Sequence, residues 1–275
     1  MNPKVLVVQK SAAKNTLADI ASWIELGEKA CCDIVIFPEY MNGVFMVEQY
    51  DHVATLSLKI SLQQLAEKHH IALIASFLER IDNKYFNIAY YIGSTGAIKG
   101  THKKIALTKY YEAHALTPGN EVCVIPTEFG NVGIMICRDM FYPQITERLV
   151  AQGAQIIFCP CYWAYDSTEY EQNAALIKTQ FPVDADLHAI SVLPQSRAIE
   201  NEVFFVVANA AGTLSSGTYS ERLCGYSSIA SPLYGTLAIL SNHEEGCLIQ
   251  ELHMDLLKDS AATFSVRETA PALSP

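Results

Sequence analysis

The chain has 275 residues, of which half are apolar and 17% are charged, and its formal net charge is −10. This apolar content excludes an intrinsically disordered chain, and the excess of acidic residues argues against nucleic acid as a partner, since nucleic-acid-binding proteins present a basic surface. No apolar run approaches the roughly 18 residues that a membrane-spanning helix needs, and the first residues lack the hydrophobic region of a secretory signal. We therefore expect a cytoplasmic protein without a membrane partner.

Short apolar runs rich in β-branched residues recur along the chain and predict strands. Most of these runs are continuously apolar, which is typical of strands that are covered on both faces. They comprise residues 5–8, 34–37, 71–75, 132–137, 156–159 and 203–208. Apolar residues at helical spacing lie between them, around Leu17 and Leu58 and over residues 143–152 and 194–201. This alternation of strands and helices predicts a layered α/β domain.

Two regions depart from the alternation. Residues 81–98 read as a hairpin, with turn signals at Asp82-Asn83 and Gly93-Ser94, and residues 226–252 are again rich in strand-forming residues. The segment 165–188 has the weakest periodicity, so we expect either a long surface excursion or part of the wall of a binding site.

Reactive side chains follow three of the predicted strands. Glu39 comes after the run 34–37 and Pro38, Cys137 ends the run VGIMIC, and Lys103 and Lys104 follow the predicted hairpin. Strand ends are where α/β folds expose functional groups. Each residue taken alone has a more ordinary interpretation: a solvated charge for the glutamate or the lysines, and a buried structural thiol for the cysteine.

The eight cysteines form an even set that is compatible with disulfides. A chain of this size buries enough apolar surface to fold without such bonds, so we expect reduced thiols. Cys159 and Cys161 suggest two alternatives, a metal site or a thiol redox protein. No second Cys/His pair at zinc spacing accompanies them, and the sequence lacks a C-x-x-C motif for redox chemistry. We expect neither a metal nor another cofactor.

Several blocks of sequence occur in an order that matches a known family. Glu39 lies in CCDIVIFPEYMNG, Lys104 in HKKIAL followed by EAHALTPGNE, and Cys137 in VGIMICRDMFYPQ followed by GAQIIFCPCYWA. Over residues 5–257 the chain resembles the nitrilase superfamily of carbon–nitrogen hydrolases, whose members use a Glu-Lys-Cys triad. The resemblance implies a four-layer α-β-β-α sandwich, with a hydrolase domain over residues 1–262 and a tail over 263–275. It also implies a homodimer or a larger homo-oligomer.

The resemblance assigns roles to four residues. Glu39 matches the general base, Cys137 the nucleophile, and Glu112 a second glutamate that orients the lysine or the substrate nitrogen. Lys104 rather than Lys103 matches the triad lysine, because it stands three residues before Leu107. The family often has His where this chain has Ala106, so we expect one local polar contact to be missing.

The expected substrate is a small molecule with a carbon–nitrogen bond. Nitrilases usually carry Trp-Glu after the nucleophile, whereas this chain carries Arg138-Asp139. We therefore expect hydrolysis of an amide or a carbamoyl compound through a cysteine thioester. Nitrile hydrolysis is the first alternative, and a catalytically idle scaffold on the same fold is the second. The residues that we expect to contact the substrate are Arg138, Tyr40, Tyr111 and Trp163.

Overall fold

The computed structural model describes residues 1–11, 16–109, 112–167, 185–216 and 219–269. Within them the chain forms two six-stranded sheets and one three-stranded sheet. The strands of the first large sheet are, in spatial order, β15 (Gly246–Glu251), β1 (Lys4–Gln9), β2 (Ile34–Ile36), β3 (Ala72–Ile81), β4 (Lys84–Ile92) and β5 (Ile98–Lys103). Those of the second are β14 (Gly235–Ile239), β13 (Ser228–Ser231), β10 (Phe204–Asn209), β8 (Ile156–Cys161), β7 (Gly130–Ile134) and β6 (Val124–Thr127).

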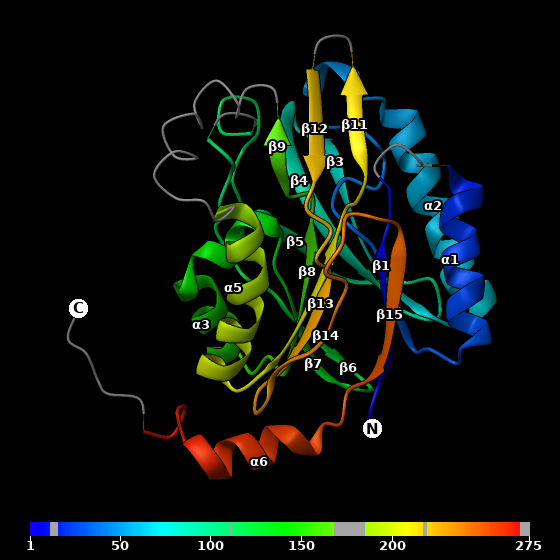
Figure 1. The fold of residues 1–275 in the computed structure, drawn as a ribbon. Helices are drawn as coiled ribbons and strands as arrows, with labels where there is room; N and C mark the ends of the chain where they lie inside the picture. The colour runs from blue at the N-terminus through cyan, green and yellow to red at the C-terminus, as the bar shows by residue number, and fades with distance from the viewer. Residues whose placement is uncertain (12–15, 110–111, 168–184, 217–218, 270–275) are drawn as a thin grey trace.

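Helices cover the outer faces of both large sheets. In Figure 1, α1 (Leu17–Lys29) and α2 (His52–His69) lie beside the first sheet, while α3 (Pro143–Ala151) and α5 (Ala185–Asn201) lie beside the second. The helix α6 (Asp255–Phe264) crosses below the sheets, on the side where the chain begins. The small sheet combines β11 (Thr213–Ser216), β12 (Tyr219–Leu223) and β9 (Ala164–Ser167). This α-β-β-α arrangement confirms the expected fold class.

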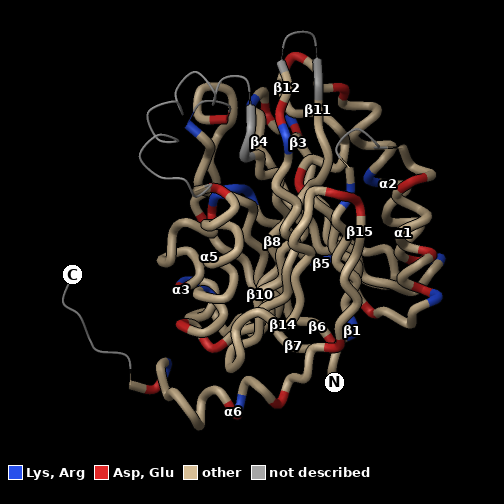
Figure 2. The backbone as a smooth tube through the Cα atoms, in the orientation of Figure 1, with Lys and Arg blue, Asp and Glu red and all other residues tan. Residues whose placement is uncertain are grey.

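Alternation of side chains along β1 explains why this strand is apolar throughout. Val5 and Val7 join the large cluster between the two sheets, whereas Leu6 and Val8 join the cluster between the first sheet and its helices. Because consecutive side chains of a strand point to opposite faces, a strand covered on both sides needs an unbroken apolar run. Charged residues accordingly gather on the helices and loops, and the strands are largely free of them (Figure 2).

A hairpin is present, but it begins earlier than the predicted range 81–98: it consists of β3, which ends at Ile81, and β4, and the two strands pair in antiparallel register. Its turn consists of Asp82 and Asn83, both with positive φ angles of 48° and 61°. Two adjacent residues in the left-handed region favour a tight two-residue hairpin, and Asp and Asn tolerate that region better than most residues. The second turn signal, at Gly93, connects β4 to β5 and leads the chain toward Lys104.

Helix starts were the least accurate expectations. Helix α2 begins at His52, six residues before Leu58, because the Asp51 side chain accepts hydrogen bonds from the N–H groups of Val53 and Ala54. Helix α5 begins at Ala185 and contains Pro194 in its interior. It packs on β10, β13 and β14, and such packing stabilises a helix more than residue propensity does. The rest of the weakly periodic segment, residues 168–184, lies outside the described residues.

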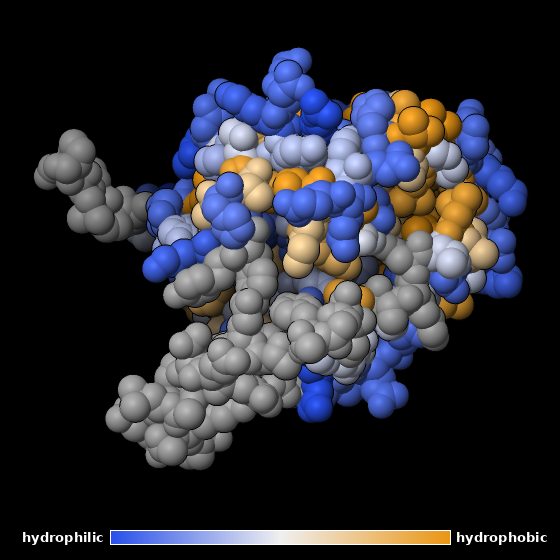
Figure 3. Space-filling view, turned by 90° about the horizontal axis from the view of Figure 1, so that it is seen from above, coloured by the Kyte–Doolittle hydropathy of each residue, from blue (hydrophilic) through white to orange (hydrophobic). Residues whose placement is uncertain are grey.

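In the described part of the chain, no helix is both long enough and apolar enough to cross a bilayer. Viewed from above, the described surface is mostly hydrophilic, with hydrophobic residues grouped toward one side (Figure 3).

Candidate active site

Glu39 lies where the ends of the two large sheets meet. Its backbone N–H donates to the carbonyl of Cys161, the last residue of β8, so the loop after β2 is tied to the opposite sheet. The residue is 3% exposed. Its Oε1 accepts from Lys104 Nζ at 2.8 Å and from Asn87 Nδ2 at 2.6 Å, and its Oε2 accepts from the N–H of Tyr162 at 2.8 Å.

Lys104 directly follows β5 and is 2% exposed. Its Nζ lies 2.8 Å from Glu39 Oε1 and 2.8 Å from Glu112 Oε2, so one ammonium bridges two buried carboxylates. Glu112 also accepts from the Tyr40 hydroxyl and from the N–H of Thr108. Lys103, by contrast, is exposed and places its Nζ 4.4 Å from the centre of the Phe86 ring. The structure therefore brings Lys104, and not Lys103, between the two glutamates.

The two carboxylates differ in their protonation behaviour. Burial raises the pKa of Glu39 above its ordinary value of 4.5, although Lys104 partly opposes the rise. Burial alone would also raise the pKa of Glu112, but Lys104 and the hydrogen bonds from Tyr40 and Thr108 hold it below 4.5. The pKa values of the two carboxylates that contact Lys104 are thus shifted in opposite directions. Such a difference indicates a division of roles, in which Glu112 stays charged and Glu39 exchanges a proton.

The protonation of Lys104 is set by the same contacts. Burial alone would lower the pKa of this lysine, but Glu39 and Glu112 outweigh that effect and hold it well above its ordinary value of 10.5. The Cys137 thiol lies within electrostatic reach and adds to the rise. Lys104 is therefore a fixed positive charge between two carboxylates and a thiol.

Cys137 occupies a strained turn between the second sheet and α3. Strand β7 ends at Ile134, three residues earlier than the apolar run predicts, and Cys137 begins the 3-10 turn η2 (Cys137–Phe141). Its φ angle of 44° lies in the left-handed region, which non-glycine residues rarely adopt. Residues held in such conformations cluster at functional sites, because the surrounding structure must compensate for their strain.

Two further thiols lie beside Cys137. Cys159 and Cys161 have their sulfur atoms 3.7 Å apart, and both are completely buried. Burial raises the pKa of Cys161 well above its ordinary value, and hydrogen bonds with Cys137 and Cys159 add to the rise. Burial likewise raises the pKa of Cys159. Both thiols therefore stay protonated at neutral pH, and the described residues contain no group of three ligands suited to a metal around them.

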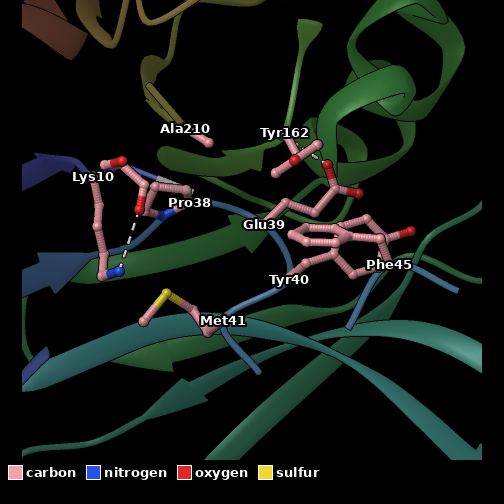
Figure 4. A pocket seen from close by; sticks show the side chains of 9 residues that line it. Lys10, Pro38, Glu39, Tyr40, Met41, Phe45, Tyr162 and Ala210 are labelled. Carbon is pink, nitrogen blue, oxygen red and sulfur yellow. Dashed lines mark hydrogen bonds between the residues drawn. The ribbon is translucent and has the colours of Figure 1, made fainter. Parts of the chain in front are cut away.

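A small cavity opens onto Glu39. Its wall includes Lys10, Tyr40, Met41, Phe45 and Tyr162. In Figure 4 the Glu39 carboxylate points toward Tyr162, with Lys10 on the opposite side and Met41 below. The Tyr40 hydroxyl is engaged by Glu112, so this residue contributes its ring to the cavity wall.

The other expected substrate contacts have different positions. The guanidinium of Arg138 lies 5.9 Å from the Phe141 ring. The Trp163 ring lies 5.0 Å from the same ring, and its indole N–H donates to Asp186. Trp163 thus borders the turn that contains Cys137 rather than the cavity in Figure 4. Tyr111 lies outside the described residues.

Sequence reasoning missed Asn87 and the N–H of Tyr162. Asn87 is buried on β4 and donates to both Glu39 and Glu112, while its carbonyl accepts from the Lys104 N–H. The available signal was a single amide side chain inside the apolar run of β4. Arg197 and Glu200 form an i, i+3 ion pair on α5, and Arg197 also donates to the carbonyl of Met140 in the turn that contains Cys137.

Gly119 keeps Lys104 in place. Its N–H donates to the Lys104 carbonyl at 2.8 Å, and an added Cβ would overlap the carbonyl oxygen of Lys103. We expect Gly119→Ala to lower stability by about 1–3 kcal/mol and turnover by about tenfold or more, since the backbone carrying Lys104 must shift. Urea unfolding and turnover measure the two effects.

Gly93→Ala is the matched control for this change. The added Cβ would meet the flexible side chain of Lys99 at 3.2 Å and the carbonyl oxygen of Ala97 at an ordinary contact distance of 3.6 Å, and the expected loss of stability is within about 1 kcal/mol. Equal stability and turnover in the two variants would show that the position of the Lys104 backbone is not sensitive to Gly119.

The fold and this arrangement of side chains define a class of protein, the four-layer hydrolases that act on carbon–nitrogen bonds. The model of the carbon-nitrogen hydrolase family matches residues 4–262. The chain therefore belongs to the carbon–nitrogen hydrolase family.

Similar proteins match most or nearly all of the chain. A probable nitrilase of Schizosaccharomyces pombe is 25% identical, over 93% of this chain and 87% of the relative. An N-carbamoylputrescine amidase of Solanum tuberosum is 25% identical, over 88% of this chain and 82% of the relative. The crystal structure of an amidase from Nesterenkonia is 20% identical and superimposes with a TM-score of 0.76, covering 97% of this chain and 96% of the amidase.

Proposed function

We propose that this enzyme hydrolyses a small amide or carbamoyl compound through a thioester on Cys137. The observation that carries the proposal is the buried Lys104 held between Glu39 and Glu112, whose pKa values shift in opposite directions, within electrostatic reach of the Cys137 thiol. A base, a cation and a nucleophile gathered in one site are the components of acyl transfer by covalent catalysis.

The first half of the proposed reaction forms the thioester. Glu39 takes the proton of the Cys137 thiol, and the sulfur attacks the carbonyl carbon of the substrate. Lys104 and the backbone N–H of Arg138 stabilise the negative charge on the resulting oxyanion. The carbon–nitrogen bond then breaks, and Glu39 returns its proton to the nitrogen, so ammonia or an amine leaves.

The second half releases the acid. A water molecule enters beside Glu39, which takes one of its protons, and the hydroxide attacks the thioester carbon. The carbon–sulfur bond breaks, and the proton returns to Cys137. Glu112 remains charged throughout and holds Lys104 in position, which agrees with its lowered pKa. The proposed scheme uses no metal or organic cofactor.

The substrate class is supported by the relatives. Their names include an omega-amidase of Arabidopsis thaliana and N-carbamoylputrescine amidases as well as nitrilases. A variant of the Nesterenkonia amidase carries the acetamide moiety of fluoroacetamide on its active-site cysteine. We propose that Arg138, the ring of Tyr40 and Trp163 contact the substrate, together with Tyr111.

Ammonia release from a panel of small amides, carbamoyl compounds and nitriles tests the proposal. We expect release from at least one amide or carbamoyl compound, together with an acyl adduct on Cys137 in the intact mass. Cys137→Ala is expected to abolish both signals, whereas Cys159→Ala, which removes a buried thiol nearby, is expected to keep them. A Cys137→Ala variant with full activity would rule out the mechanism.

The same panel separates the alternatives. A larger kcat/KM for nitriles than for every amide and carbamoyl compound would favour a nitrilase. An enzyme inert toward the whole panel, with Cys137 unreactive toward iodoacetamide, would favour the idle scaffold.

We further propose a homodimer or larger homo-oligomer in the reducing cytoplasm, with a hydrolase domain over residues 1–262 and a tail over 263–275. All eight cysteines are thiols rather than members of disulfides, and five are buried, which agrees with a reducing compartment. The family match over residues 4–262 supports the domain boundary. Light scattering during size exclusion tests the assembly, and a mass near 30.3 kDa would contradict it.

A further inference from the structure

A buried carboxylate outside the Glu-Lys-Cys group lies between the two catalytic segments. Asp139, two residues after Cys137, is 0% exposed. The described residues donate four hydrogen bonds to its carboxylate. Its Oδ1 accepts from the N–H groups of Ile105 and Ala106, at 3.1 and 2.7 Å. Its Oδ2 accepts from the N–H of Ile136 at 3.0 Å and from His102 Nε2 at 2.9 Å.

These contacts tie together the backbone on either side of the proposed catalytic residues. Ile105 and Ala106 follow Lys104, while Ile136 and Asp139 flank Cys137. One carboxylate therefore links the segment after β5 in the first sheet to the turn after β7 in the second. A small displacement of this carboxylate would change the separation of Lys104 from Cys137.

His102 supplies a side-chain donor to that carboxylate. It is 1% exposed on β5, two residues before Lys104, and pairs with Asp139 across the gap between the sheets. The oxygen of an ionised carboxylate only accepts, so Nε2 carries the proton of the bond. The Nδ1 atom is buried without a partner among the described residues. A neutral imidazole protonated at Nε2 leaves no N–H unsatisfied, whereas a proton on Nδ1 would have no acceptor.

We propose that His102 is a positioning residue, which orients Asp139 so that Asp139 sets the distance between Lys104 and Cys137. This inference rests on the proposed roles of Lys104 and Cys137. The polar contact at Asp139 is supplied from β5 by His102, and residue 106 contributes its backbone N–H.

Two amide substitutions separate positioning from packing. His102→Gln places an N–H donor near the position of Nε2, within reach of Asp139, whereas the amide of His102→Asn is too short to reach it. We expect kcat within about threefold of the wild type for His102→Gln. For His102→Asn we expect kcat to fall about 10- to 100-fold with KM changed less than threefold, because misplaced reacting groups slow chemistry more than binding.

The alkylation rate of Cys137 by iodoacetamide is measured alongside turnover, by peptide mass spectrometry. It needs no substrate, so it tests His102 even if no compound in the panel is hydrolysed. We expect slower alkylation of Cys137 in His102→Asn and an unchanged rate at the exposed Cys31, which serves as the internal reference. Equal kcat and equal Cys137 alkylation in the Gln and Asn variants would overturn the proposal.

Two further measurements keep the proposal testable if His102→Asn fails to fold. Adding Ala106→His to this variant is expected to restore folding and most of the turnover, because the backbone N–H of residue 106 already lies 2.7 Å from Asp139. In the wild-type protein, nitrogen NMR of the histidines is expected to show His102 protonated at Nε2. Protonation at Nδ1 alone would contradict the bond to Asp139 and with it the proposal.

Discussion

Replacing Glu39 with Gln is expected to lower kcat by about 10²- to 10⁴-fold, the range that general acid–base catalysis contributes. The amide cannot take the proton of Cys137 or of the attacking water. Its oxygen can still accept from Lys104 and Asn87, as Glu39 Oε1 does. In the wild type, the N–H of Tyr162 donates to Glu39 Oε2. The amide nitrogen of the introduced glutamine would replace that acceptor with a second donor. We therefore also expect a loss of about 1–3 kcal/mol in stability.

Glu79→Gln is the matched control for this prediction. Glu79 is another buried glutamate and pairs with Lys59 at 2.8 Å, on the outer side of the first sheet. Its replacement also removes a buried carboxylate beside a lysine. Turnover per folded molecule is expected to stay at the wild-type level. If the Glu39→Gln enzyme were as active as Glu79→Gln, Glu39 would have no part in the reaction. Stopped-flow turnover and urea unfolding separate the two effects.

Lys104→Met is expected to lower kcat by about 10²- to 10³-fold, the loss that follows removal of one oxyanion-stabilising donor. The same change leaves Glu39 and Glu112 buried without their shared counter-ion. Breaking a buried ion pair from one side costs about 3–5 kcal/mol in stability. Methionine is chosen because it fills a similar volume, so the loss reports charge rather than a cavity.

The stability loss in Lys104→Met is expected to depend on pH. In the wild type, the pKa of Glu112 is held below its ordinary value of 4.5, so its stabilising contribution is present above that value and declines as the pH falls through the folded-state pKa. In the variant, both carboxylates lose their cation and their folded-state pKa values rise. Protonation then relieves the folded state, so the variant loses less stability at acid pH.

The measurement is urea unfolding of both proteins at pH 5 and pH 8. We expect the gap in unfolding free energy to be smaller at pH 5. Lys103→Met serves as the control, because Lys103 is exposed and contacts the Phe86 ring rather than a carboxylate. It is expected to change stability by less than about 1 kcal/mol at either pH. A gap for Lys104→Met that does not shrink toward acid pH would contradict the proposed charge of Glu39 and Glu112.

The sequence alone predicted where the reactive side chains would fall along the chain. Glu39 follows a run of strand-forming residues, Cys137 ends one and Lys104 follows the predicted hairpin, and the strands β2, β5 and β7 end shortly before them. Such runs can be recognised in the sequence because the alternation of side chains along a strand depends only on neighbouring residues. Helix starts were less predictable. That of α2 depends on one Asp51 side chain, and α5 passes through Pro194 because sheet packing holds it.

The tertiary structure alone decided which groups meet and which charges they carry. Asn87 and His102 are unremarkable in the sequence, and they join the site, as Asp139 does, through strand register and through contacts between the two sheets. The opposite pKa shifts of Glu39 and Glu112 have the same origin. A pKa depends on burial and on charges nearby in space, and Lys104 reaches Glu39 from 65 positions away in the chain. The sequence determined the strands and the chemistry available at their ends, whereas packing of the two sheets determined how that chemistry is divided among the residues.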